Sequence, residues 1–144
     1  MKLKFFLTFL LLLIAYCIPL TATIRYVSKT GTSTPPYTSW QTAADSIQKC
    51  INICVDGDTI YVANGIYKEN LVINTAISLI GSSMDSTVID GRGLLPNKII
   101  ELLSDIYLEN FNLIGKDKNV TSYGIFSLQN NINAKNCRIS NSFD

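Results

Sequence analysis

An internal repeat near the end of the chain constrains the fold more than any other feature of the sequence. The segment DIYLENFNLIG (105–115) matches NINAKNCRISN (131–141) position by position, at a constant shift. The matched pairs are Ile106 with Ile132, Leu108 with Ala134, Asn110 with Asn136, Phe111 with Cys137, and Leu113 with Ile139. A period of about two dozen residues is typical of one turn of a parallel β-solenoid, in which short strands and bends stack on the turns above and below.

One asparagine recurs in the repeat, because Asn110 and Asn136 come directly before Phe111 and Cys137. An asparagine at a bend can bond its side-chain amide to the backbone and to the equivalent asparagine one turn away, which satisfies its polar groups. We therefore expect Asn110 and Asn136 to form such a chain.

A third copy of the Ile-x-Leu core of the repeat occurs in AISLIG (76–81). In this alignment Leu79 is equivalent to Leu113. The two leucines are further apart in the chain than Leu113 and Ile139 are. The larger shift requires a longer excursion, and we expect TVIDGRGLLPN (87–97) to supply it.

Short β-rich segments separated by Gly, Asn, Asp and Ser occupy most of the chain, which is the pattern of alternating strands and turns. The expected strands lie within 23–31, 59–63, 70–74, 76–81, 86–91, 98–102, 105–115, 123–128 and 131–140.

The stretch from Trp40 to Val55 has a different pattern, with apolar residues three and four positions apart, which predicts an amphipathic helix. Thr38 and Gln41 have the spacing of a capping box at its start, and Gly57 supplies a left-handed stop at its end. Laid over the first turn of a solenoid, such a helix would cover the open strand edge and prevent edge-to-edge aggregation.

Several ordered elements resemble the N-terminal segment of right-handed parallel β-helix proteins of the pectin lyase-like superfamily, especially its exported bacterial members. They are Tyr26-Val27-Ser28, Gly57-Asp58-Thr59-Ile60, Gly65-Ile66-Tyr67-Lys68-Glu69 and Thr87-Val88-Ile89-Asp90-Gly91. The resemblance covers about residues 24–144. It implies an all-β fold, a right-handed parallel β-helix (solenoid) with an N-terminal amphipathic cap helix. Because these elements belong to the scaffold, the resemblance implies the fold and leaves the activity open.

Residues 1–22 read as a signal peptide, since two lysines precede an apolar run and a small-residue cleavage site near Ala22. Their removal leaves a net charge of about −1 and no basic run, which argues against nucleic-acid binding. Since the apolar run is removed with them, we expect no membrane anchor in the mature chain. We expect a secreted or cell-surface protein.

Residues 23–57 would hold the first strand, the loop and the cap helix, and residues 58–144 the β-helix turns. The turns end without a closing cap, so we expect the N-terminal portion of a longer protein.

The carboxylates are interpreted as scaffold, so we predict no catalytic, cofactor-binding or metal-binding residue. Asp56 and Asp58 would supply too few of the oxygen ligands that calcium requires. We therefore expect a turn in which their carboxylates bond backbone amides. Glu69 lacks a positioned second carboxylate for acid–base catalysis. The other acidic residues are spread over different strands and bends: Asp85, Asp90, Glu101, Asp105 and Glu109.

The superfamily implies a further test, because its pectate lyases hold calcium on an acidic cluster beside an arginine. Apart from Arg92, the arginine that follows the cap region is Arg138. Its equivalent one turn earlier is Asn112, so no acidic cluster aligns with it in the repeat.

Three cysteines follow the signal peptide, which is an odd number. We expect them to be small apolar residues rather than parts of disulfides or of a zinc site: Cys50, Cys54 and Cys137.

The aromatic residues leave two possibilities open. Tyr107, Tyr123 and Phe126 would form a sugar-stacking platform on one face, or they would pack between turns. The sequence NVT at 119–121 matches a glycosylation sequon, which we attribute to chance.

Together these observations favour an exported, non-catalytic module that binds a polysaccharide or cell-surface glycan or has a structural role at the cell surface. The alternative is the N-terminal part of a pectate lyase-like or pectinesterase-like enzyme whose catalytic turns lie beyond residue 144. An adhesin is a third, weaker possibility.

Overall fold

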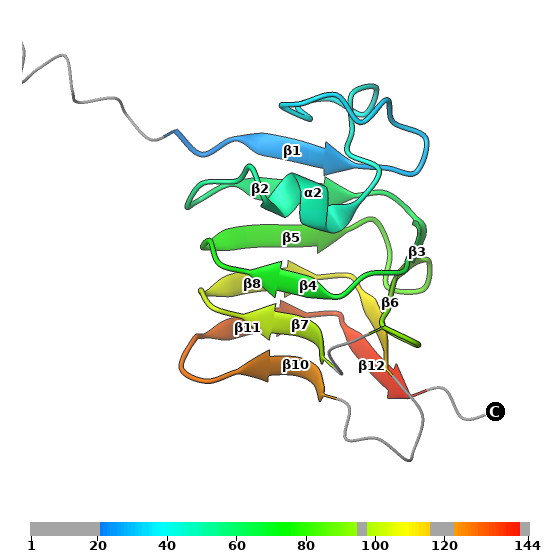
Figure 1. The fold of residues 1–144 in the computed structure, drawn as a ribbon, viewed down its shortest axis with the longest axis vertical. Coiled ribbons are helices and arrows are strands. Elements are labelled where there is room, and N and C mark those ends of the chain that lie inside the picture. The colour runs from blue at the N-terminus through cyan, green and yellow to red at the C-terminus, as the bar shows by residue number, and fades with distance from the viewer. Residues whose placement is uncertain (1–20, 95–97, 116–122, 142–144) are drawn as a thin grey trace, which may run out of the picture.

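The computed structural model describes residues 21–94, 98–115 and 123–141, which form parallel β-sheets and one short helix (Figure 1). Sheet A contains β1 (Ile24–Val27), β2 (Thr59–Val62), β5 (Ile77–Gly81), β8 (Ile106–Glu109) and β11 (Ile132–Lys135). Sheet B contains β3 (Gly65–Tyr67), β6 (Thr87–Asp90), β9 (Asn112–Gly115) and β12 (Arg138–Asn141). Sheet C contains β4 (Leu71–Ile73), β7 (Lys98–Leu102) and β10 (Tyr123–Ser127).

From β2 onward the chain visits sheets A, B and C in turn, and we call one such passage a coil. Each strand therefore pairs with the strand three places later, and every pair is parallel. Figure 1 shows the strands of each sheet stacked above one another, from β1 at one end to β10, β11 and β12 at the other. The expectation of an all-β, parallel fold is thus confirmed.

The strand register confirms the repeat at the end of the chain. Ile132 pairs with Ile106 and Ala134 with Leu108 between β11 and β8. Between β12 and β9, Ile139 pairs with Leu113, as the constant shift of the repeat predicts. Alternation of apolar and polar residues over each segment therefore identified both the strands and their partners.

The Ile-x-Leu core of 76–81 does recur in register with Ile106 and Leu108, but the alignment of Leu79 with Leu113 is wrong. Leu79 pairs with Leu108 in sheet A, whereas Leu113 pairs with Ile89 in sheet B. The tripeptide Leu-Ile-Gly ends both β5 and β9, so identical letters suggested an equivalence that the chain path does not allow. A strand's partner is decided by its place in the coil, and the two tripeptides occupy different places.

Side chains that point between the sheets form stacks of equivalent residues. Ile60, Leu79 and Leu108 follow one another through sheet A, and all three are buried. In sheet B the buried Tyr67 is followed by Ile89 and Leu113, in register. Full burial of one such side chain stabilises the fold by roughly 1.5–3 kcal/mol, so these stacks supply the driving force for coil stacking.

The helix is much shorter than predicted, because α2 spans only Ile47–Ile51 and begins at the N-cap Ser46 instead of at Thr38. Residues 39–42 instead form a turn, and Ala44 bridges to Val27 of β1, where Ser28 N donates to Ala44 O and Ala44 N donates to Tyr26 O. These long-range backbone bonds compete successfully with a helix that the local spacing alone would favour.

The short helix nevertheless covers a strand edge, as expected. Figure 1 shows α2 above β4, in the column of sheet C, and α2 contacts both β1 and β4. The side-chain amide of Gln48 accepts a 2.9 Å hydrogen bond from Val72 N and donates a 3.2 Å bond to Val72 O. Gln48 thus takes the place of a neighbouring strand at the edge of β4, which satisfies groups that would otherwise attract another chain.

Two sequence predictions fall outside the described residues. They are the signal peptide, of which only 21–22 are described, and the sequon at 119–121. In the part of the chain that is described, no helix combines the length and the apolar character needed to cross a membrane.

Candidate functional site

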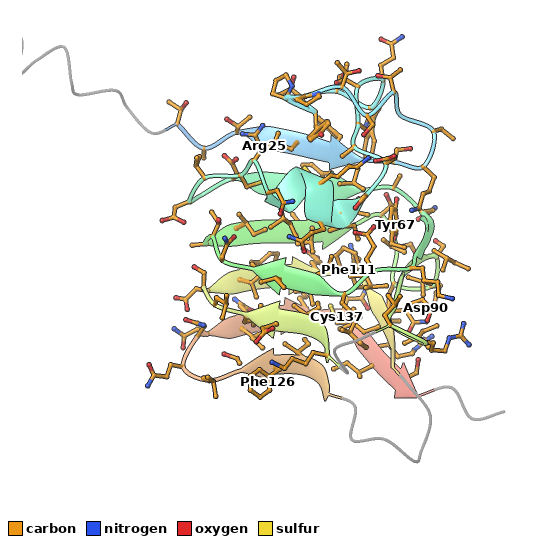
Figure 2. The ribbon with its side chains drawn as sticks, viewed as in Figure 1. Arg25, Tyr67, Asp90, Phe111, Phe126 and Cys137 are labelled. Carbon is orange, nitrogen blue, oxygen red and sulfur yellow. The ribbon has the colours of Figure 1, made fainter. Side chains whose placement is uncertain are left out.

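Asp58 is a fully buried carboxylate that joins the beginning of β1 to the turn before β2. It accepts hydrogen bonds from Thr23 N at 2.6 Å and Val55 N at 3.1 Å, and its Oδ2 lies 2.9 Å from Arg25 Nε. Burial alone would raise the pKa of Asp58, but the two backbone amides and the Arg25 guanidinium together hold this pKa below its ordinary value. Asp58 is thus an ionised structural anchor; Figure 2 labels Arg25 on β1.

Asp56 has a similar role on the surface of the same turn. Its Oδ1 accepts a 2.9 Å bond from Ala76 N, while Gly57 N donates a 2.7 Å bond to Ala76 O. Gly57 has φ of 90°, which side-chain-bearing residues rarely adopt. The interpretation of this segment as a turn in which carboxylates bond backbone amides is confirmed.

Glu69 caps the N-terminus of α2. Its carboxylate accepts bonds from Ser46 Oγ at 2.8 Å, Ile47 N at 3.1 Å and Gln48 N at 3.0 Å. These contacts confirm the scaffold interpretation of Glu69. They also explain why a glutamate stands at the end of the segment Gly65–Glu69, since the helix that it caps lies well before it in the chain.

The remaining described carboxylates are each held by a cation or an amide. The pairs are Asp45 with Lys49, Asp85 with Arg138, Asp90 with Arg92, Glu101 with Lys98, Glu109 with Lys135, and Asp105 with Asn131. Among the residues described here, no three His, Cys, Asp or Glu side chains lie close enough together to hold a metal ion. These carboxylates are therefore distributed as separate pairs over all three sheets and the helix.

The aromatic platform considered above is not formed. Tyr107 lies on β8 in sheet A, whereas Tyr123 and Phe126 lie on β10 in sheet C. The ring of Phe126 is covered by Lys98 Nζ at 4.0 Å from its centroid. This outcome rules out the first of the two possibilities, because β8 and β10 belong to different sheets and the sequence pattern does not show to which sheet a strand belongs.

A different aromatic cluster, composed of Tyr26, Trp40 and Tyr61, lies at the first strands of sheet A. The ring centroids of Tyr26 and Trp40 are 4.6 Å apart with planes tilted by 56°. The rings of Tyr26 and Tyr61 are stacked, with planes 27° apart and centroids 6.1 Å apart. Trp40 is 49% exposed and Tyr61 is 37% exposed, so the cluster presents aromatic surface to solvent.

The chain assembles this cluster from distant segments. Tyr26 pairs with Tyr61 in the β1–β2 register, which places both side chains on the outer face of the sheet. The loop that carries Trp40 returns to β1, where Tyr26 N donates to Tyr37 O and Ala44 N donates to Tyr26 O. Sequence reasoning missed the cluster; the outward positions of Tyr26 and Tyr61 on two strands were the available signal.

A shallow groove of about 330 Å³ lies further along the same sheet. We call it the sheet A groove; it is lined by Gly57, Ala76, Ile77, Ser78, Asp105, Ile106, Tyr107, Asn131, Ile132 and Asn133. Ala76, Asp105 and Asn131 each directly precede a strand of sheet A, so the groove runs across successive coils. Ser78, Tyr107 and Asn133 are aligned by register and supply hydroxyl and amide groups.

The charged side chains on this face are held either by an opposite charge or by an amide. Lys135 Nζ lies 2.9 Å from Glu109 Oε1, and Tyr107 Oη donates a 2.7 Å bond to Glu109 Oε2. The Lys135 ammonium and then the Tyr107 hydroxyl hold the pKa of Glu109 below its ordinary value. Bonds from Asn131, first from its backbone amide, likewise lower the pKa of Asp105. Both carboxylates are thus anionic at neutral pH.

The three described cysteines carry free thiols. Cys50 is buried, as expected of a small apolar residue, and Cys54 and Cys137 are partly buried. The contact with Cys54, together with burial, raises the pKa of the Cys50 thiol far above its ordinary value, so Cys50 is un-ionised and unreactive.

Comparisons with models of protein families, with curated proteins and with solved structures found no match for this chain. The candidate site is therefore interpreted from its own geometry. It combines an exposed aromatic cluster with a groove of mixed polar and apolar lining on sheet A.

Proposed function

We propose that this chain folds as a right-handed parallel β-helix of the pectin lyase-like type. The regular order of sheets A, B and C supports this proposal, since it makes each coil a parallel strand–crossover–strand connection. Such connections are right-handed in about 98% of cases because of the twist of β-strands. The sequence elements that resemble this superfamily support the same fold.

The function that we infer is carbohydrate binding by an exported, non-catalytic module, with the outer face of sheet A as the binding surface. The observation that carries it is the exposed cluster of Trp40, Tyr26 and Tyr61. Aromatic rings offer rigid apolar surface against which the C–H face of a sugar ring packs. In the adjacent sheet A groove, Ser78, Tyr107 and Asn133 offer donors and acceptors for sugar hydroxyls.

Binding ranks ahead of catalysis because of how the carboxylates are used. Glu69 caps α2 and Asp58 is neutralised by Arg25, so these two residues serve the scaffold. Glu101 and Glu109 are held by lysines. No pair among the described residues stands out as the two positioned carboxylates that glycoside hydrolysis requires.

Trp40 is the only tryptophan in the sequence, and this makes a direct test possible. Its intrinsic fluorescence reports on the proposed surface without any label. Soluble glycans of several classes would be titrated into the purified chain while the emission of Trp40 is recorded. Binding should change the intensity or the emission maximum in a saturable manner.

The matching retention experiment is affinity electrophoresis in gels that contain the same glycans. A glycan that changes Trp40 emission should also retard the wild-type chain. Absence of both effects for every glycan class would contradict carbohydrate binding at this surface. Release of unsaturated uronides or reducing ends by the chain would instead favour the enzymatic alternative.

A further inference from the structure

The shape of the sheet A groove indicates how a ligand would lie on it. The groove extends from Gly57 over Ala76 and Asp105 to Asn131, and these residues belong to the bends that precede β2, β5, β8 and β11. It therefore crosses four neighbouring strands, perpendicular to their direction. Neighbouring strands are about 4.8 Å apart, so a ligand that fills the groove must be extended over several sugar units.

The aromatic cluster lies on the same face at the β1–β2 end of the sheet. One outward row contains, in register, Tyr26, Tyr61, Ile80, Glu109 and Lys135. A second outward row contains Ile24, Thr59, Ser78, Tyr107 and Asn133. An extended ligand along these rows would meet apolar and aromatic surface first and hydroxyl and amide groups further on.

The charges on this face bear on the class of the ligand. Lys135 is the cation of the two rows, and it is paired with Glu109 at 2.9 Å. Asp105 adds a negative charge to the groove wall, where it is bonded to Asn131 N at 2.8 Å. Arg25, on the neighbouring strand position, is turned inward to Asp58 and is only 8% exposed. The described groove therefore offers a polyuronate no unpaired cation and one repulsive carboxylate.

We propose that the ligand is a linear, uncharged polysaccharide that lies across the strands of sheet A, from the aromatic cluster along the sheet A groove. This inference rests on the proposed carbohydrate-binding function and adds the ligand class to it. Uncharged sugars need only stacking and two-way hydrogen bonds, both of which the two rows provide. Acidic polysaccharides, which the family resemblance would suggest first, are disfavoured by the Asp105 carboxylate in the groove wall and by the pairing of Lys135 with Glu109.

The test compares neutral with acidic glycans by Trp40 fluorescence. Cello-oligosaccharides, xylo-oligosaccharides and soluble mixed-linkage β-glucan represent the neutral class, and oligogalacturonate and oligoalginate of matched length the acidic class. We expect neutral hexasaccharides to bind at least about ten-fold more tightly than acidic ones and than neutral disaccharides. Affinity for the neutral class should be insensitive to salt, because no charge pairing is involved.

Variants sharpen the comparison. Asp105→Lys should improve binding of the acidic hexasaccharides by roughly ten-fold at low salt, and this gain should disappear at high salt. Ile66→Ala, on sheet B, is the control and should change neither class.

The outcomes separate the two proposals. Tighter, salt-dependent binding of uronates by the wild-type chain would overturn the ligand class while supporting carbohydrate binding. Equal binding of disaccharides and hexasaccharides would overturn the extended orientation. If no glycan of either class binds, the proposed function itself fails.

Discussion

The side-chain amide of Asn136 donates a 2.7 Å hydrogen bond to Oδ1 of Asn110, its equivalent in the preceding coil. Asn110 Nδ2 in turn donates a 3.1 Å bond to Gly81 O, one coil earlier again. Both asparagines have left-handed backbones, with φ of 63° and 49°. This bend thus links three coils through side-chain amides, in residues that tolerate the unusual φ better than most others.

Replacement of Asn110 should show the two components of this role. Asn110→Gly removes the hydrogen bonds but accepts the positive φ, whereas Asn110→Ala removes the bonds and adds backbone strain. We expect the alanine variant to lose about 2 kcal/mol of unfolding free energy or more, and the glycine variant to lose less. Urea denaturation followed by circular dichroism measures both; equal losses would show that the backbone conformation contributes nothing.

The buried Asp58–Arg25 pair predicts a specific pH dependence. Because the pKa of Asp58 is lowered in the folded state, its stabilisation is fully present above the unfolded pKa of about 3.9 and is lost as pH falls through the folded value. Asp58→Asn should cost roughly 3 kcal/mol at pH 7, and its difference from wild type should shrink below about pH 4. Denaturant titrations between pH 7 and pH 3 measure this difference.

The exposed Asp85–Arg138 pair is the matched control, since its atoms are 3.4 Å apart and the Asp85 side chain is 77% exposed. Asp85→Asn should cost less than about 1 kcal/mol at pH 7. A loss for Asp85→Asn as large as that for Asp58→Asn would contradict the assignment of Asp58 as the main anchor.

Gln48 should protect the edge of β4. Gln48→Ala leaves Val72 N and Val72 O without their side-chain partner, so we expect a loss of about 1–2 kcal/mol and faster aggregation. Gln41→Ala is the control, because the sequence placed a capping box at this exposed residue and the helix begins only after Ser46. Thermal unfolding and light scattering measure both effects. A larger loss of stability for Gln41→Ala than for Gln48→Ala would instead favour the longer helix that the sequence pattern predicted.

Tyr61 should contribute directly to glycan binding. Tyr61→Ala leaves Trp40 as the fluorescent reporter and removes one ring of the aromatic cluster, so affinity should fall by about ten-fold. Ile66→Ala removes a 66% exposed apolar side chain from sheet B and should leave affinity unchanged. Equal effects of the two substitutions, with unchanged circular dichroism, would locate the binding surface elsewhere.

Much of the local structure is contained in the sequence. The constant period of the repeat predicted the register of the last two coils, because inward side chains must alternate and equivalent positions must stack. Asp56 and Asp58 were recognisable as turn residues for a local reason, since a short carboxylate beside glycine readily bonds nearby amides. Strand β3 was not among the expected strands, because it begins with Gly65, a residue that disfavours strands, whereas the equally short β4 consists of Leu71, Val72 and Ile73.

Only the tertiary structure decided which segments became neighbours. Leu79 and Leu113 carry the same local sequence but lie in different sheets, since the chain path and not the tripeptide sets the partner. Ala44 joined β1 instead of a helix because backbone bonds to distant residues outweighed a modest local preference. The same long-range pairing brought Trp40 onto Tyr26 and aligned Tyr26 with Tyr61. Periodicity determines which way a side chain points, and the three-dimensional path determines what it meets.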